Sequence, residues 1–183
     1  YTREKIREID RAAGELELCQ PLLLRITDPD GSLYSGQTGG FRSEELPELM
    51  DMIDGLPHVK IGGFTTFPAL LYDADEKAIT PTPNMKGLDR AVELARDRGL
   101  KDLIINVPSA TCVSSIPLIH ALGGNNGEPG HGLTGTTPLH KDTTQPEKVG
   151  YVYVTEVSHN FGGRAYCYGG GLYRRGHMEN ALV

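Results

Sequence analysis

The stretch DLIINVPSATCVSSIPLIHALGGNNG, residues 102–127, contains the pattern that decides the fold. Asp102–Asn106 is an apolar run with the length of a buried strand, and Ser114–Leu122 has the composition of a short helix. Gly123–Gly127 then leads into the end of another strand. A strand followed by a helix and a second strand implies parallel pairing, because a return to the same edge of a sheet needs a crossover connection. This stretch therefore predicts an α/β fold.

The same alternation occupies the residues before this stretch. Pro21–Thr27 and His58–Thr65 are strand candidates, while Ser43–Asp54 and Met85–Arg98 are helix candidates. The Ser43 side chain is expected to begin its helix by accepting a hydrogen bond from a backbone amide. Strands and helices in alternation extend the prediction of a parallel sheet to most of the chain.

The remaining segments complete the expected order of elements. Tyr1–Gly14 predicts a charged helix, and the residues around Pro81-Thr82-Pro83 predict a long loop. Towards the other end, Tyr151–Val157 and Arg164–Tyr168 have the composition of strands, and the sequence closes on the apolar triplet Ala181-Leu182-Val183. A sequence that begins inside a helix and stops in a strand predicts that these residues are part of a longer polypeptide.

Composition and charge argue against several classes of function. The 183 residues carry 18 Lys+Arg against 24 Asp+Glu, a net charge of −6. Because no basic cluster extends beyond Arg174-Arg175, nucleic acid is not an expected partner. The longest apolar runs, such as Pro21–Leu24, are too short to cross a bilayer. The cysteines are odd in number, widely spaced and without a C-x-x-C motif, which favours a reducing cytoplasm over a disulfide framework or a zinc ribbon. They are Cys19, Cys112 and Cys167.

Polar residues gather where the predicted strands end. Glu128–Thr136 reads EPGHGLTGT, and its three glycines let backbone amides converge on an anion such as a phosphate monoester. In Asn106–Thr111, Ser109 and Thr111 lie where a second phosphate contact would fall if the two strands are neighbours. Such strand ends suit either a doubly wound sheet or a (β/α) barrel. Ordinary polar turns are the alternative interpretation.

Several motifs together resemble one family. The sequence is similar to the fold-type-III pyridoxal 5′-phosphate (PLP) enzymes, the alanine racemase-like proteins, and within them to the YhfX-type branch. The resemblance extends over essentially the whole sequence and is most specific in its last third. The motifs that carry it are GFTTFP (63–68), PTPN (81–84), NVPSAT (106–111), EPGH (128–131), YCYGGG (166–171) and YRRGH (173–177).

The resemblance implies a fold, a cofactor and partners. It implies that residues 1–148 form about the second half of a PLP-binding (β/α)8 TIM-type barrel and that residues 149–183 form the first strands of a C-terminal β domain. It thereby favours the barrel over the doubly wound sheet. It also implies PLP as the cofactor, an amino acid as the small-molecule substrate, and a homodimer.

Carried over residue by residue, the resemblance identifies candidate cofactor ligands. It puts the backbone amides of Gly130 and His131 at the cofactor phosphate, with Ser109 as a hydroxyl donor. It puts Glu128 against the pyridine nitrogen, where alanine racemases have an arginine and the related basic-amino-acid decarboxylases have a glutamate. A carboxylate there favours a protonated ring, which withdraws electrons more strongly. The alternative is that Glu-Pro-Gly forms only a turn.

Other family positions are altered in this sequence. Thr66 stands at the strand exit where racemases place a histidine against the cofactor ring, and it is counted among the cofactor-binding candidates. Thr38 stands where racemases have an arginine on the substrate side, which argues against recognition of a simple alanine carboxylate in the racemase manner. Tyr168 resembles the β-domain tyrosine that acts as a catalytic base in the partner subunit's active site, with Tyr166 as its rival. The lysine that binds the cofactor covalently is expected before Tyr1.

Two classes of function agree with these residues. The first is a PLP-dependent enzyme of amino-acid metabolism acting at Cα, most simply a racemase or epimerase and thus an isomerase, with a decarboxylase or lyase as an alternative. The second is a non-catalytic PLP-binding or carrier protein. The β domain favours an enzyme, because single-barrel PLP binders without turnover lack one, but these residues alone are expected to be inactive. No metal site is expected, because no histidine pair has the i,i+4 spacing of helical ligands.

Overall fold

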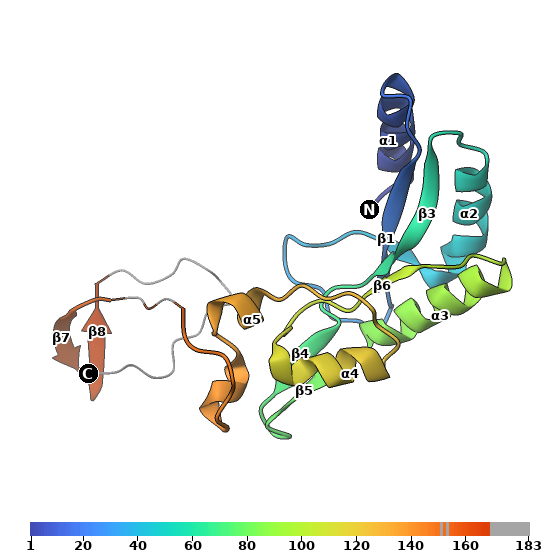
Figure 1. Ribbon diagram of the computed structural model, residues 1–183. Helices are drawn as coiled ribbons and strands as arrows, with labels where there is room; N and C mark the ends of the chain where they lie inside the picture. Colours follow the sequence, from blue (N-terminus) through green and yellow to red (C-terminus); the bar gives the residue numbers. More distant parts are fainter. Residues whose placement is uncertain (151, 153, 169–183) are drawn as a thin grey trace. The chain divides into compact units, whose positions relative to one another are not determined.

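The computed structural model describes residues 1–150, 152 and 154–168 (Figure 1). The chain divides into two compact units, Tyr1–Lys148 and Val149–Val183. The motifs at 169–171 and 173–177 and the predicted strand Ala181–Val183 lie outside the described residues.

A parallel sheet of four strands forms the centre of the first unit. In spatial order the strands are β2 (Phe41–Arg42), β1 (Gln20–Thr27), β3 (Val59–Thr65) and β6 (Ile104–Asn106). All three pairings are parallel, and Asn126 continues the sheet through a single parallel bridge to Asn106. The predicted parallel α/β sheet is confirmed, including the expected strand end near Gly123–Gly127.

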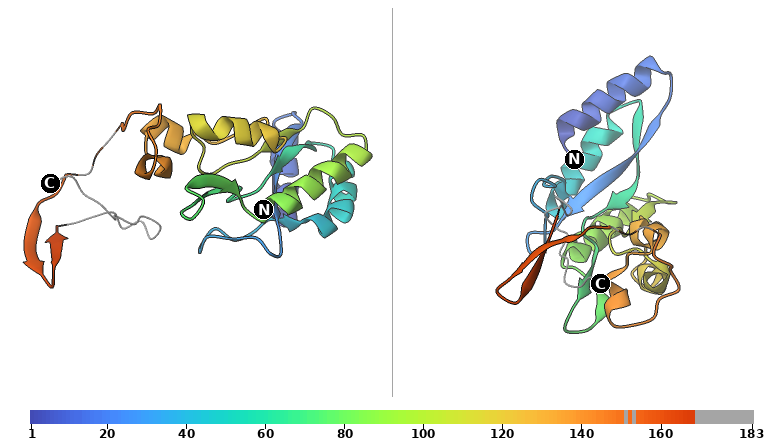
Figure 2. Two further views of the ribbon diagram at one scale, coloured as in Figure 1. Left: turned by 90° about the horizontal axis from the view of Figure 1, so that it is seen from below. Right: turned by 90° about the vertical axis from the view of Figure 1, so that its left-hand side faces the viewer.

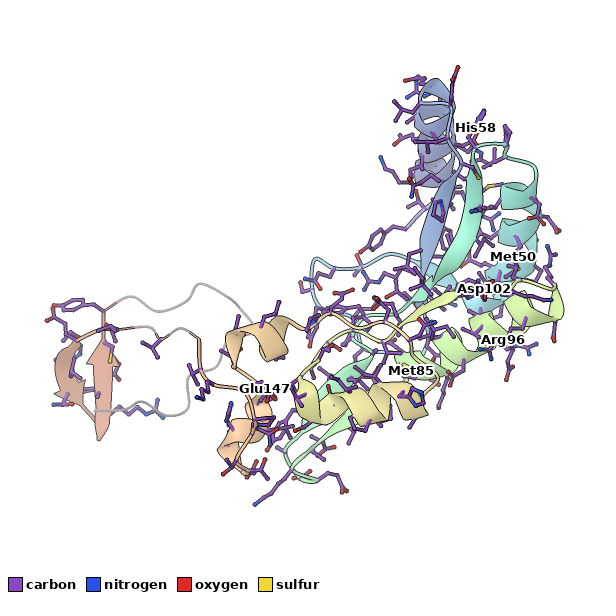
Figure 3. All side chains as sticks on the ribbon, in the orientation of Figure 1. Met50, His58, Met85, Arg96, Asp102 and Glu147 are labelled. Carbon is purple, nitrogen blue, oxygen red and sulfur yellow. The ribbon has the colours of Figure 1, made fainter. Side chains whose placement is uncertain are left out.

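Three helices precede or connect these strands. They are α1 (Arg3–Glu15), α2 (Leu46–Asp54) and α3 (Asn84–Asp97). In Figure 1, α2 and α3 lie side by side against one face of the sheet, and Figure 2 shows α1 running along β1 and β3. Met50 of α2 and Met85 of α3 belong to this packed layer (Figure 3). Strand residues Leu24, Phe64 and Ile105 fill the layer from the sheet side and are almost fully buried.

The start of α2 differs from the sequence prediction. A 3-10 turn, η1 (Ser43–Glu45), precedes the helix, and Ser43 already lies inside that turn. The Ser43 hydroxyl donates to the Glu44 carboxylate at 3.3 Å instead of accepting from an amide. The cap is made by Glu45, whose carboxylate accepts a hydrogen bond at 2.8 Å from the amide of Arg42. The prediction for Ser43 was wrong because Arg42 is the last extended residue and therefore holds the cap position.

A β-hairpin occupies the region for which the sequence predicted a long loop. Strands β4 (Leu70–Asp73) and β5 (Ala78–Pro81) pair antiparallel. The Asp73 carboxylate closes the turn by accepting from the amides of Asp75 and Glu76 at 2.9 and 3.0 Å. The strands are four residues each, too short for their alternation to be distinguished from loop sequence.

The residues after β6 form short helices. They are the 3-10 turn η2 (Val113–Ser115), α4 (Ile116–Ala121), α5 (Gly130–Thr134) and the 3-10 turn η3 (Pro138–Lys141). Glu147, labelled in Figure 3, follows these helices in the sequence but folds back to their start. Its buried carboxylate accepts a hydrogen bond from the backbone amide of Val113. The glycine-rich segment predicted as an open loop thus contains one helical turn, ended by Gly135 at a φ of +67°.

The second unit contains an antiparallel hairpin. Strands β7 (Val157–Phe161) and β8 (Arg164–Cys167) are joined by Gly162 and Gly163, both with positive φ. The predicted strand Arg164–Tyr168 is confirmed to within one residue. The predicted strand Tyr151–Val157 is displaced, because its described residues before Val157 are not in a strand. The sequence analysis did not recognise that Gly162-Gly163 forms the turn, which sets the register between β7 and β8.

Candidate functional site

The sheet presents two different faces, and the described helices of the first unit pack against only one of them. Parallel register places Leu23 beside Gly63 and Gly63 beside Ile104 in one row across β1, β3 and β6. Leu23 and Ile104 are 45% and 47% exposed, whereas their neighbours on the opposite face are buried against the helices. Gly63 has no side chain because a Cβ there would lie 2.0 Å from the Ile104 carbonyl oxygen. This open face corresponds to the interior of a barrel.

The next row on this face is polar. Arg25 is in register with Thr65, and Thr65 is in register with Asn106, at the carboxyl ends of the three strands. A cavity of about 480 Å³ lies over this row. Its lining residues are Tyr1, Arg25, Gly36, Gln37, Thr38, Thr65, Phe67, Pro108 and Glu128. Ligands of α/β proteins bind at this end of the strands, so the cavity is the candidate site.

Asn106 connects the strand ends to Glu128. Its side-chain amide donates at 2.9 Å to the Thr65 hydroxyl and at 2.9 Å to Oε1 of Glu128. Its side-chain oxygen accepts from the Asn126 amide at 2.8 Å. Asn106 is only 1% exposed, so these three bonds fix one oxygen of an otherwise exposed carboxylate at the cavity wall. The sequence analysis placed Asn106 in a motif and did not identify this positioning role.

Arg25 is the second feature that the sequence analysis missed. Its side chain is 5% exposed, and its guanidinium donates to the Phe67 carbonyl at 3.0 Å. The guanidinium carbon lies 5.3 Å from the centre of the Tyr1 ring. An arginine between the apolar residues of LLLRI was the available signal, because a charge within a buried strand is unusual.

The predicted phosphate ligands have partners within the chain. The amide of Gly130 donates to the Glu128 carbonyl at 2.8 Å. The Ser109 hydroxyl donates to the Leu70 carbonyl at 2.6 Å and accepts from the Leu70 amide at 3.0 Å. Ser109 and Ala110 both have positive φ, at 75° and 48°, so Ser109 holds a strained turn against the β4–β5 hairpin. The cofactor roles of Gly130 and Ser109 stay predictions, and in this structure both groups are engaged.

Two further candidates occupy different environments. Thr66 is buried, and its hydroxyl donates to the Ile26 carbonyl of the neighbouring strand at 2.9 Å, a structural bond. His131 lies in the first turn of the exposed helix α5, with its Nδ1 3.2 Å from the Thr136 hydroxyl. Neither Thr66 nor His131 lines the cavity over Arg25. Their cofactor roles also stay predictions.

The two tyrosine candidates lie in the second unit. The Tyr166 ring is stacked on His159, with 4.7 Å between ring centres. Tyr168 is 62% exposed, and its backbone pairs with Glu156 and Thr155 at the base of the hairpin. The stacking occupies one face of the Tyr166 ring and leaves Tyr168 as the more accessible phenol.

No described helix is long and apolar enough to span a membrane. No group of three or more His, Cys, Asp or Glu side chains in the described part of the chain is arranged to hold a metal ion.

A parallel α/β sheet with a polar carboxyl end, and with the described helices packed on one face, is typical of a TIM-type barrel domain. Comparison with known families gives the specific assignment. Residues 1–138 match the alanine racemase N-terminal domain, and residues 152–183 match the YhfX-like C-terminal domain. The chain therefore belongs to the family of the alanine racemase N-terminal domain, and its C-terminal residues are similar to those of the YhfX-like proteins. The predicted family and fold class are confirmed.

Two individual proteins illustrate the relationship. The chain is 42% identical over 183 residues to the uncharacterized protein YhfX of Escherichia coli (strain K12). The match covers 100% of this chain and 47% of YhfX, so the chain spans about half the length of that relative. The solved structure of PipY from Synechococcus elongatus PCC7942, with PLP bound, is 24% identical at a TM-score of 0.43. That match covers 69% of this chain and 54% of PipY.

Proposed function

We propose that the protein binds PLP in the cavity over the Arg25–Thr65–Asn106 row and acts at the Cα of an amino acid as a racemase or epimerase. The observation that carries the proposal is the position of Glu128. One of its oxygens is held by Asn106, and Oε2 has no hydrogen-bond partner among the described residues. A carboxylate with one oxygen fixed and one available at the cavity wall is suited to hold a proton on a ring nitrogen.

The cavity is large enough for the cofactor and includes Glu128, whereas the predicted phosphate ligands Ser109, Gly130 and His131 do not line it. A volume of about 480 Å³ falls in the range that accommodates small cofactors. When bound, PLP supplies the electron sink that stabilises negative charge at Cα. Within the chain, Asn106 orients Glu128, and Phe67 and Pro108 give the cavity apolar wall. The membership in the alanine racemase family supports the same cofactor.

The phosphate end of the site requires a local change. The amide of His131 lies in the first turn of α5, where amides have no acceptor within the helix. The amide of Gly130 becomes available only if its bond to the Glu128 carbonyl is exchanged for the ligand. A Cβ at Gly130 would meet no atom within 4 Å, so the backbone there is open to an approaching group.

The experiment compares the full-length protein with Glu128→Gln. Glutamine keeps the size of the side chain and the acceptor for Asn106 but removes the charge. We expect PLP to bind in both proteins. The rate of Cα proton exchange in deuterated water should fall at least about tenfold in Glu128→Gln, which corresponds to about 1.4 kcal/mol of activation free energy. A panel of amino acids identifies the substrate.

The outcomes separate the two functions that the sequence left open. Bound PLP with no proton exchange for any amino acid would favour a carrier over an enzyme. Full activity of Glu128→Gln would remove Glu128 from the site. Release of carbon dioxide without racemisation would identify a decarboxylase.

Three further parts of the proposal concern the whole protein. Tyr168 is the candidate for the base on the opposite side of Cα, which in this family requires a homodimer. Its exposed side chain supports this role over that of Tyr166. All three cysteines are unpaired, which supports a cytoplasmic location. Loss of exchange in one direction only in Tyr168→Phe would support a two-base reaction, whereas unchanged exchange would exclude Tyr168.

A further inference from the structure

Arg25 is a buried cation without a counter-ion in the part of the chain that the structure describes. The ion pairs among the described residues do not include it. Its terminal nitrogen donates to the Phe67 carbonyl, but Nε is buried and has no hydrogen-bond partner. The Tyr1 ring lies on the guanidinium at 5.3 Å, which contributes an attraction weaker than an ion pair.

An unpaired guanidinium in this position is costly. Removing a charge from water without a partner destabilises a protein by several kcal/mol, and buried arginines are therefore paired in most structures. The neighbouring positions of β1 are apolar and serve the core, so nothing in the packing of the strand requires a cation at Arg25. An anion that enters the cavity would supply the missing partner.

The lining of the cavity indicates the kind of anion. Gln37, Thr38 and Thr65 bring neutral polar side chains to it, and Glu128 is its only carboxylate among the described residues. Glu128 is held by Asn106 rather than by Arg25. The cavity therefore has one positive wall and one negative wall; Glu128 is the residue proposed for the ring nitrogen of the cofactor, which leaves the positive wall for a carboxylate.

We propose that Arg25 binds the carboxylate of the amino-acid substrate, an inference that rests on the proposed function. Thr38, on the loop that precedes β2, brings a neutral side chain to the cavity, so the cation comes from strand β1. Arg25 lines the cavity, and the planar guanidinium is a group of N–H donors that carboxylates accept in a bidentate manner. Because Arg25 lies on a strand, its position is fixed more firmly than that of a loop residue.

The test measures carboxylate binding independently of turnover. The full-length protein, with and without PLP, is titrated with propionate and with its neutral analogue propionamide by isothermal calorimetry. The variants are Arg25→Gln, Arg25→Lys and the control Arg42→Gln, in which the same substitution is made at an exposed arginine of the adjacent strand.

We expect propionate to bind the wild-type protein more tightly than propionamide, and Arg25→Gln to weaken propionate about tenfold or more, a loss of about 1.4 kcal/mol. Arg25→Lys should weaken it less, because lysine keeps the charge but not the fork. Propionamide binding and PLP content should be unchanged in both variants. Arg42→Gln should match the wild type.

Two results would overturn the inference. The first is that the wild type, Arg25→Lys and Arg25→Gln all bind propionate with the same affinity. The second is equal affinity of the wild type for propionate and propionamide. If Arg25→Gln does not fold, equal affinity in Arg25→Lys and wild type for both ligands decides against the fork. Failure of the wild type to retain PLP would instead contradict the proposed function. If that PLP-free protein still bound propionate in a manner that depends on Arg25, the carboxylate site would be supported without the cofactor.

Discussion

The substitution Asn106→Ala tests whether the bonds between the strand ends and Glu128 hold the site together. Asn106 is buried at the end of β6 and makes hydrogen bonds of 2.9, 2.9 and 2.8 Å to Thr65, Glu128 and Asn126. Alanine removes all three while keeping the backbone pairing of the strand. We expect a less stable barrel unit and a Glu128 carboxylate that is no longer oriented.

The magnitude follows from the partners. The bonds to Thr65 and Asn126 join neutral groups and contribute about 1 kcal/mol each, and the bond to Glu128 is charge-assisted and contributes roughly 1.5 kcal/mol. Glu128 and Asn126 are exposed, so water replaces part of the loss. The free energy of unfolding of the full-length protein should therefore fall by about 2–3 kcal/mol.

The assay is urea unfolding followed by circular dichroism, in a double-mutant cycle with Glu128→Ala. We expect a coupling energy of about 1–1.5 kcal/mol between Asn106 and Glu128. Asn106→Ala combined with Glu93→Ala, on the exposed side of α3, serves as the control and should be additive. A loss below about 0.5 kcal/mol for Asn106→Ala, or additivity with Glu128→Ala, would refute the positioning role.

Three further changes test other parts of the structure. Gly63→Ala should lower the free energy of unfolding of the full-length protein in urea by about 2–3 kcal/mol, because the new Cβ would lie 2.0 Å from the Ile104 carbonyl oxygen. The control Gly55→Ala, whose Cβ would meet no atom closer than 3.5 Å, should change stability little. Equal effects of the two substitutions would contradict the close approach of the strands at Gly63. Gly130→Val should fold normally but lose PLP, and unchanged PLP content after purification would remove Gly130 from the phosphate site. Partial desolvation, and then the charge of Glu93, raise the pKa of Asp89, so its ionised form is less favourable in the folded state. Asp89→Asn should therefore stabilise the protein at neutral pH by ~0.5 kcal/mol or less, and the gain should vanish as the pH falls below the ordinary aspartate range; a gain that grows in acid would reverse the sign of the argument.

The family and most of the elements could be predicted because their signals are local. The predicted helix Met85–Arg98 is α3, in which Leu88, Val92 and Ala95 share one helical face and are buried. Gly99, with a φ of +82°, follows the end of that helix in the conformation that favours glycine. The EPGH motif at 128–131 brought Glu128 to attention, and Glu128 does line the cavity at the strand ends.

The sequence by itself indicated the alternation of the main strands and helices, the parallel sheet and the family, because periodicity and short motifs are properties of neighbouring residues. Only the tertiary structure decided which polar groups meet. The burial of Arg25 without a counter-ion, the bond from Asn106 to Glu128 and the engagement of Ser109 by Leu70 each join residues distant in sequence. Such contacts depend on how the strands are aligned when the sheet forms. Arg25, Thr65 and Asn106 lie in one row because β1 pairs with β3, and β3 with β6, in one particular register.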